Sequence, residues 1–252
     1  MSCTVKAMSF NLLVGWDHGG ENSFLNRRER ILKVIEKEDP DVIGFQEASD
    51  AMRLWLKNEL KGYTVIGCGR GRHYSGEAAA IAFKHDKFDL LATENFWLSP
   101  TPTIPGTRFP EQSNCPRVSQ FATLVSKDLA KPFVFGNTHL DHVGSEARVL
   151  GNTLNAQYLS TRDEKFIFTG DFNAYPEAPE ITDFKAALAY RGITDCAEDC
   201  GGTFHNFGKM SARIDYIFTD AKCISAHVVP DDNPEGLFYS DHNAVCAEIE
   251  LD

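Results

Sequence analysis

Short apolar segments rich in β-branched and aromatic residues recur along most of this 252-residue chain. Such segments are typical of β-strands when turn residues separate them, and they limit the possible folds more than any other feature of the sequence. They lie at 5–13, 42–45, 63–68, 78–83, 88–98, 118–126, 133–140, 165–169, 213–218, 224–229 and 244–251.

Helical patterns separate only some of these segments. They lie at 24–38, where Leu25, Ile31 and Ile35 recur at helical spacing, and at 49–60, 145–160 and 181–191. A doubly wound parallel sheet would carry a helix between most successive strands, so the pattern argues against that fold. Because no internal repeat or low-complexity linker interrupts the chain, we expect residues 1–252 to form one α/β domain with mixed sheets.

The overall composition excludes several classes of protein. Hydrophobic residues make up 42% and charged residues 24% of the chain, as in ordinary globular proteins. No apolar run reaches the roughly 18 residues of a transmembrane helix. The N-terminal sequence MSCTVKAMSFNLL also lacks the basic start and apolar core of a secretory signal. We therefore expect a cytoplasmic protein without a transmembrane segment.

The net charge of −11 at pH 7 bears on the choice of substrate. It argues against a protein that holds nucleic acid on a broad basic surface. It does not exclude an enzyme that handles phosphate through a metal ion, because the carboxylates of such a site are balanced only when the cation is bound.

The seven cysteines are scattered along the chain. Cys196 and Cys200 have a C-x3-C spacing without a second pair nearby, so a zinc site there is the weaker of two interpretations. Reduced and mostly buried thiols are the better one.

Polar residues with catalytic chemistry gather where the strand-like segments end. Each of them alone is typical of a turn, a solvated strand end or a structural histidine. Their repetition at several strand ends indicates more, because α/β folds collect catalytic groups in the loops at these positions. The set comprises Asn11, Glu47, His139, Asp171, Asn173, Asp215, Asp241 and His242.

These residue types match the needs of phosphate-ester hydrolysis. Carboxylates and amides supply the hard oxygen ligands that Mg²⁺ prefers, and histidines transfer protons. A metal ion and a proton-transfer group together can drive the attack of water on phosphorus. The sequence therefore predicts a metal-dependent hydrolase of phosphate esters.

The ordered segments SFNLL, DVIGFQE, NTHLDH, GDFNAYPEAP, RIDYIF and SDHNAV resemble the endonuclease/exonuclease/phosphatase superfamily. Its members include deoxyribonuclease I, abasic-site endonucleases, poly(A) deadenylases, sphingomyelinases and inositol-polyphosphate 5-phosphatases. The resemblance runs from Ser9 to Val245 and is nearest to deadenylase-like and uncharacterised bacterial-type members. It implies a deoxyribonuclease I-like, four-layer α/β/β/α sandwich, in which two mixed sheets pack face to face with helices outside and the site lies at one edge.

The resemblance also implies a metal site. Glu47 matches the main magnesium ligand, Asn11 lies beside that metal, and Asp241 matches a second carboxylate on the metal side. The expected cofactor is Mg²⁺, with Mn²⁺ as an alternative. The choice between one metal and two stays open.

Catalytic roles follow from the same resemblance. Asp171 and Asn173 match the pair that positions the attacking water and the scissile phosphate, and Asp215 with His242 matches a carboxylate–histidine pair. The general base is left open between His242, favoured by its ordinary pKa, and Asp171. His139 matches a histidine that contacts the phosphate or protonates the leaving oxygen, and Glu77 is its expected carboxylate partner.

Departures from the family patterns guide the substrate prediction. GDFNAYPEAP lacks the arginine of the inositol 5-phosphatase signature. This difference favours a phosphodiesterase or nuclease, in which water attacks phosphorus in line. The alternatives are a phosphomonoesterase for a small phosphorylated metabolite or lipid head group and, less favoured, a non-catalytic binding protein. No leucine-rich repeat offers a docking module, and the oligomeric state is open. The candidate substrate-binding residues are Arg117, Arg148, Arg213 and Phe207.

Overall fold

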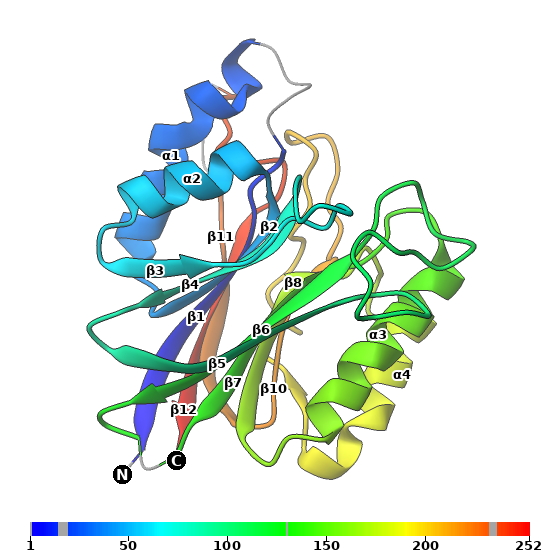
Figure 1. Cartoon of the computed structure of the whole chain (residues 1–252). Coiled ribbons are helices and arrows are strands. Elements are labelled where there is room, and N and C mark those ends of the chain that lie inside the picture. The colour runs from blue at the N-terminus through cyan, green and yellow to red at the C-terminus, as the bar shows by residue number, and fades with distance from the viewer. Residues whose placement is uncertain (1, 15–19, 130, 232–235) are drawn as a thin grey trace.

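The computed structural model describes residues 2–14, 20–129, 131–231 and 236–252. Two mixed sheets of six strands each form its centre (Figure 1). The first sheet has the order β11 (Lys222–Val229), β12 (Ala244–Leu251), β1 (Cys3–Asn11), β2 (Val42–Ala48), β4 (Ala78–Lys84) and β3 (Tyr63–Ile66). The second has the order β5 (Phe88–Trp97), β6 (Val118–Ser126), β7 (Phe133–His139), β8 (Lys165–Asp171), β10 (Asp215–Thr219) and β9 (Thr194–Asp195).

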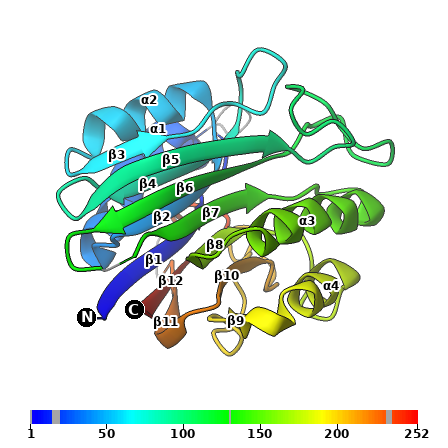
Figure 2. The ribbon, with the colours of Figure 1, turned by 60° about the horizontal axis from the view of Figure 1, so that its bottom comes forward.

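Helices cover the outer faces of both sheets. The helices α1 (Phe24–Glu38) and α2 (Asp50–Glu59) lie on the first sheet, and α3 (Ser145–Ser160) and α4 (Pro179–Ala187) lie beside the second (Figures 1 and 2). Short 3-10 helices occupy Gly20–Asn22 and Ala189–Arg191. The expected four-layer sandwich is therefore confirmed. No helix in the described ranges has the length and apolar character needed to cross a membrane.

Three groups of buried apolar side chains correspond to the three interfaces between the four layers. Ile35 of α1 and Leu56 of α2 pack on the first sheet. Val42 from the first sheet and Phe135 from the second belong to the group between the sheets. Phe184 of α4 lies in the third group, with residues of α3 and the second sheet. Burial of apolar area in all three interfaces holds the layers together.

A polar contact also joins the two sheets beneath the strand ends. The amide nitrogen of Asn137 in β7 donates to the carbonyl oxygens of Phe45, at 2.8 Å, and Ala80, at 2.9 Å, in the first sheet. Gly44 permits this close approach, because a Cβ at that position would lie 2.0 Å from Oγ1 of Thr169. The sheets are thus fixed relative to each other where the polar strand ends begin.

Most predicted elements agree with the structure within about two residues at each end, and the last predicted helix differs most in extent. The helices predicted at 24–38 and 145–160 are confirmed with the same bounds. The helix predicted at 181–191 begins earlier, at Pro179, since proline fits the first turn of a helix. It ends at Ala187, and a separate 3-10 turn follows.

Candidate active site

Strand pairing in the second sheet brings predicted catalytic residues to one edge. The parallel strands β7 and β8 end at His139 and Asp171, which are register partners. Strand β10 is antiparallel to β8, so its first residue, Asp215, is the register partner of Asp171. The chain direction of each strand therefore places the three side chains at the same end of the sheet.

The predicted site residues of the first sheet lie at the same edge. Strands β1 and β2 are parallel, with Asn11 opposite Gln46, and Glu47 is the next residue of β2. Strand β12 is antiparallel to β1, so the segment that carries Asp241 and His242 lies beside the end of β1. Six segments that are distant in sequence thus converge, as predicted from the polar strand ends.

Asn11 links the two sheets at this edge. Its amide nitrogen donates to Oδ2 of Asp171, at 3.0 Å, and lies 3.3 Å from Oε1 of Glu47. Its amide oxygen accepts from the backbone N–H of Leu13 at 3.0 Å. The amide nitrogen of Asn11, which faces the carboxylates of Asp171 and Glu47, donates hydrogen bonds and cannot bind a metal ion. Asn11 is therefore suited to hold these carboxylates in place.

Glu47 occupies a strained backbone position. Its φ angle is 60°, and the register between β2 and β4 shifts between Phe45 and Ala48, which is a local bulge. Oε2 accepts from the backbone N–H of Val14 at 2.7 Å. Left-handed backbone at a residue other than glycine is concentrated at functional sites, where it aims a side chain.

Asp215 and His242 form a buried pair. Nδ1 of His242 lies 2.8 Å from Oδ2 of Asp215, and Nε2 lies 3.8 Å from Oδ2 of Asp171. Burial lowers the pKa of His242, but the two carboxylates outweigh it and raise the pKa to about 10. The imidazole is therefore a cation at neutral pH, held between two aspartates.

Asp171 lies in a turn at a predicted catalytic position. Its Oδ1 accepts from the backbone N–H of Asn173 at 2.9 Å, across a tight turn in which Asn173 has a φ of 47°. Burial, and then the charge of Asp215, raise the pKa of Asp171 to about 7. The carboxyl group thus titrates close to neutrality, which suits a general base.

His139 lies next to this turn. Its Nε2 is 3.2 Å from the amide nitrogen of Asn173 and 3.5 Å from Oδ2 of Asp171. Burial, followed by the positive charges of Arg117 and Arg70, lowers the pKa of His139 well below its usual value. The ring is therefore neutral at neutral pH.

Arg117 brings a buried positive charge with unused donors. Its side chain is 4% exposed. Nη2 lies 2.9 Å from Nδ1 of His142, and Nε lies 3.7 Å from a carboxylate oxygen of Asp141. Within the described part of the chain, Nε and Nη1 have no hydrogen-bond partner. Arg117 lines a narrow cleft of about 10 Å³ with Glu47 and His139. A buried donor without an acceptor is costly, so these donors would suit an anion if the cleft opens to admit it.

The predicted partner of His139 is wrong. Glu77 lines the same cleft as His139, but its carboxylate accepts from Nη2 of Arg70 at 2.6 Å, and no ion pair or hydrogen bond joins it to His139 among the described residues. A guanidinium attracts a carboxylate more strongly than a neutral imidazole does. Arg70 is not among the residues predicted from the sequence, although it precedes Glu77 in the glycine-rich segment GRGRHYSGE.

Two predicted substrate-binding arginines have structural partners instead. Nε of Arg148 donates to Oε1 of Glu180 at 2.8 Å, and Nη1 donates to the carbonyl oxygen of Asp141 at 3.1 Å. Nη1 of Arg213 donates to Oδ2 of Asp195 at 2.7 Å. Arg148 therefore ties α3 to α4 and Arg213 ties β9 to the segment before β10, and the geometry offers no reason to keep either as a substrate ligand.

Phe207 belongs to a loop beside the site. The backbone N–H groups of His205 and Asn206 donate to the carbonyl oxygen of Asp241, at 2.9 Å and 3.1 Å. The rings of His205 and Phe207 lie 5.1 Å and 5.8 Å from that of Phe238. These rings form an aromatic cluster next to a predicted metal ligand.

The carboxylates at this edge fit a divalent cation. Burial raises the pKa of Asp241, and the charge of Glu47 adds to this rise against the opposing effect of His242. The buried guanidinium of Arg27 offsets part of the charge of Asp241 and Glu47. The carboxylate oxygens of these two residues are donors that suit a hard cation. Asp171, Asp215 and His242 also have ligand atoms within 4.8 Å of one another, but a protonated His242 already offsets one of these two negative charges.

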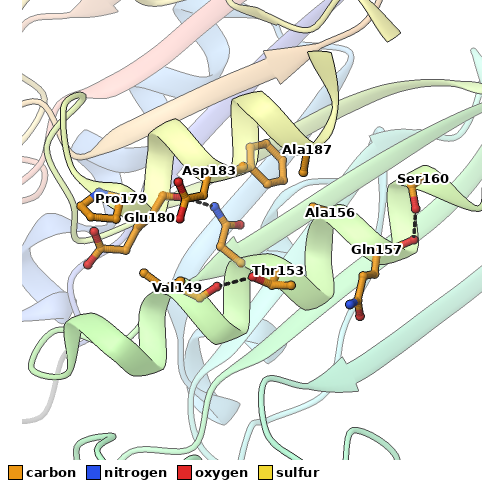
Figure 3. A pocket seen from close by; sticks show the side chains of 11 residues that line it. Val149, Thr153, Ala156, Gln157, Ser160, Pro179, Glu180, Asp183 and Ala187 are labelled. Atoms are coloured by element: carbon orange, nitrogen blue, oxygen red, sulfur yellow. Dashed lines mark hydrogen bonds between the residues drawn. The ribbon is translucent and has the colours of Figure 1, made fainter. Parts of the chain in front are cut away.

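A larger groove lies away from these residues. It runs between α3 and α4, has a volume of about 280 Å³, and is lined by residues such as Thr153, Gln157 and Asp183 (Figure 3). None of the predicted catalytic or metal-binding residues lines it. The predicted catalytic residues at the strand ends therefore lie outside this groove.

Known proteins share this architecture. An endonuclease/exonuclease/phosphatase from Bacteroides vulgatus is 27% identical, with a TM-score of 0.90 over 99% of this chain and 100% of that chain. A mannosyl-6-phosphatase from Bacteroides thetaiotaomicron is 28% identical, with a TM-score of 0.86 over 97% of this chain and 99% of that chain.

A curated viral relative matches over a shorter stretch. An uncharacterized protein of Acanthamoeba polyphaga mimivirus is 28% identical over 159 residues, which are 59% of this chain. The match spans 58% of the relative's length.

A family model covers the whole site. The model of the Endonuclease/Exonuclease/phosphatase family matches residues 8–242, a range that includes every predicted catalytic and metal-binding residue. The chain therefore belongs to this family of phosphoester-hydrolysing enzymes.

Proposed function

We propose that this enzyme is a divalent-metal-dependent phosphomonoesterase for a small phosphorylated molecule, such as a phosphorylated sugar. The observation that carries the proposal is Arg117, whose buried Nε and Nη1 lack acceptors in the cleft beside His139. A monoester has three terminal oxygens and a charge near −2, so it can satisfy both donors and offset more buried positive charge than a diester can. Similarity to a mannosyl-6-phosphatase, at 28% identity, supports this choice.

The chain's own residues can bind and orient the phosphoryl group. Arg117 donates to two of its oxygens, and the amide nitrogen of Asn173 and the neutral ring of His139 lie at the same cleft edge. Arg70 contributes positive charge but stays paired with Glu77. This arrangement orients the phosphorus toward the carboxylate of Asp171.

Two groups can transfer protons in the reaction. Asp171, with its pKa raised to about 7, takes a proton from the attacking water. His242 is protonated at neutral pH and is held in place by Asp215. It can therefore donate a hydrogen bond to a phosphoryl oxygen as negative charge develops there. This division of roles favours Asp171 over His242 as the general base.

Glu47 and Asp241 would hold the divalent cation, which we expect to be Mg²⁺ with Mn²⁺ as an alternative. Asn11 positions Glu47 from the side. When bound, such a cation polarises a phosphoryl oxygen as a Lewis acid. Because the site residues come from both sheets, residues 1–252 act as one catalytic domain in this proposal.

A second candidate is a phosphodiesterase or nuclease, the activity favoured from the sequence. The aromatic cluster of His205, Phe207 and Phe238 supports it, because such rings can stack on nucleobases. The net charge of −11 and the burial of Arg117 weigh against a long nucleic-acid substrate.

The test compares substrate classes with one protein preparation. Purified enzyme is stripped with EDTA, resupplied with Mg²⁺ or Mn²⁺, and assayed on p-nitrophenyl phosphate, bis-(p-nitrophenyl) phosphate, mannose 6-phosphate and short oligonucleotides. We expect metal-dependent release of phosphate from the monoesters, and loss of it in Asp171→Asn. Metal-dependent cleavage of oligonucleotides alone would instead establish the second candidate, and activity that survives EDTA would refute the metal requirement.

A further inference from the structure

A second cluster of metal-ligating side chains lies away from the active site. Glu38 is the last residue of α1, and it lies over the first sheet where His227 of β11 and Cys246 of β12 are register partners. Carboxylate, imidazole and thiol ligand atoms of these residues all lie within 4.8 Å of one another. Helix α1 and the two strands thus meet at three donors of different chemistry.

The geometry requires little rearrangement to hold a metal ion. Nε2 of His227 already lies 3.0 Å from Oε2 of Glu38. Zinc bonds of about 2.0 to 2.3 Å in a tetrahedron separate ligand atoms by roughly 3.3 to 3.8 Å. The cluster therefore needs shifts of about 1 Å, which side-chain rotation can supply.

We propose that Glu38, His227 and Cys246 bind Zn²⁺, with a water molecule as the fourth ligand. Zinc accepts sulfur, nitrogen and oxygen ligands together, whereas Mg²⁺ and Ca²⁺ do not take thiolate. On binding, the Cys246 thiol releases its proton to the solvent, so one thiolate and one carboxylate neutralise the two charges of the ion. The side chain of His227 is 50% exposed and gives the ion access from the solvent, while Cys246 is fully buried.

Lys6 is the cation that Zn²⁺ must displace. Its Nζ lies 2.9 Å from Oε2 of Glu38. Lys6 is also the register partner of Glu248 on β12, so its ammonium has a second carboxylate within reach on the same face of the sheet. The side chain of Lys6 is 24% exposed and that of Glu38 is 9% exposed. The exchange leaves neither charge without a partner, because Lys6 can turn to Glu248.

This site is independent of the proposed catalytic metal. Lys6 and Asn11 lie five residues apart on β1, a distance of about 17 Å along the strand. A bound ion would join the end of α1 to two strands and stabilise the fold. It would not take part in phosphate chemistry, so the inference does not rest on the proposed function.

Cobalt and zinc test the proposal directly. Co²⁺ is added to EDTA-stripped full-length protein in the presence of saturating Mg²⁺, and the thiolate-to-cobalt absorption band is followed. Zn²⁺ is then titrated to displace the cobalt. We expect the band to vanish in Cys246→Ser and the Kd for Zn²⁺ to rise at least about tenfold in His227→Ala, which removes a half-exposed side chain. Cys200→Ser, outside the cluster, should behave as wild type.

Thermal unfolding gives a second readout. Zn²⁺ at about 100 times its Kd should raise the Tm of the wild type by roughly 5 °C, and His227→Ala should lose most of that rise. A cobalt band that survives in Cys246→Ser but disappears in Cys200→Ser would overturn the assignment. Equal Zn²⁺ affinity in wild type and His227→Ala would also overturn it, because adventitious binding would then account for the ion.

Discussion

Replacing Arg117 by methionine should separate activity from stability. The methionine fills a similar elongated space but removes the charge and the two donors, Nε and Nη1, that lack partners. Each charge-assisted hydrogen bond contributes about 1.5 to 3 kcal/mol. Loss of two such bonds to the phosphoryl group amounts to about 3 to 6 kcal/mol, so kcat/KM should fall roughly 10²- to 10⁴-fold.

The same substitution should leave folding stability near that of the wild type or raise it. Arg117 is 3% exposed, and only one of its nitrogens has a hydrogen-bond partner in the described structure. Replacing a buried and poorly paired charge by an apolar group is often neutral or stabilising. The free energy of unfolding, measured in urea, should therefore change by less than about 1 kcal/mol in the unfavourable direction.

Arg148→Met is the matched control. Arg148 is also largely buried, but it donates to Glu180 and to the carbonyl oxygen of Asp141. Its removal leaves the Glu180 carboxylate without its cation, so we expect a loss of stability of about 2 to 4 kcal/mol with little change in kcat/KM. If Arg117→Met unfolded the protein while its kcat/KM stayed within threefold of wild type, Arg117 would be a structural residue and the reasoning would fail.

Three further predictions concern the site and the layers beneath it. Asp171→Asn should lower kcat at least about 10²-fold without lowering the Tm by more than a few degrees, and a near-normal kcat would return the role of general base to His242. The folded-state pKa of His242 is raised from 6.5 to about 10. The stabilisation from its pairing with Asp215 should therefore be complete below about pH 6.5 and should disappear as the pH rises to about 10. The free energies of unfolding of wild type and His242→Gln should differ most at low pH. Gly44→Ala should lose about 1 to 3 kcal/mol, since its Cβ would lie 2.0 Å from a threonine oxygen of β8, whereas Gly62→Ala, with no atom within 4 Å, should not.

The strand ends could be predicted from the sequence because their chemistry is local. Each polar residue follows an apolar run, and period and composition identify the run. The pairings could not be predicted in the same way. Asp171 faces Asp215 only because β10 is antiparallel to β8. The charge of Asp215 adds to the larger effect of burial in raising the pKa of Asp171 toward neutrality. Topology therefore decides which carboxylate has the raised pKa that a general base needs.

The buried face of α1 shows a second limit of pattern analysis. Leu25 fits the apolar spacing but is 67% exposed, while Arg27 is fully buried. The Arg27 guanidinium donates to the carbonyl oxygens of Leu12, Leu13 and Tyr239, in the segments that carry site residues. Unpaired carbonyl groups in loops must find donors, and no hydrophobic period reveals which charged residue supplies them.

The pairing of Glu77 with Arg70 affects the pKa of His139. The expected Glu77–His139 pair would have shifted that pKa in the opposite direction. Oδ2 of Asp171 already lies 3.5 Å from Nε2 of His139. A second carboxylate from Glu77 would raise the pKa of His139, whereas burial, followed by the charges of Arg117 and Arg70, lowers it. The cleft therefore places a neutral imidazole ring next to the positive charges of Arg117 and Arg70. A phosphoryl dianion bound to Arg117 would offset that charge and raise the pKa of His139, so substrate binding would itself favour the protonated ring. Under the proposed function, His139 would then be protonated in the substrate complex, as a donor to the leaving oxygen must be.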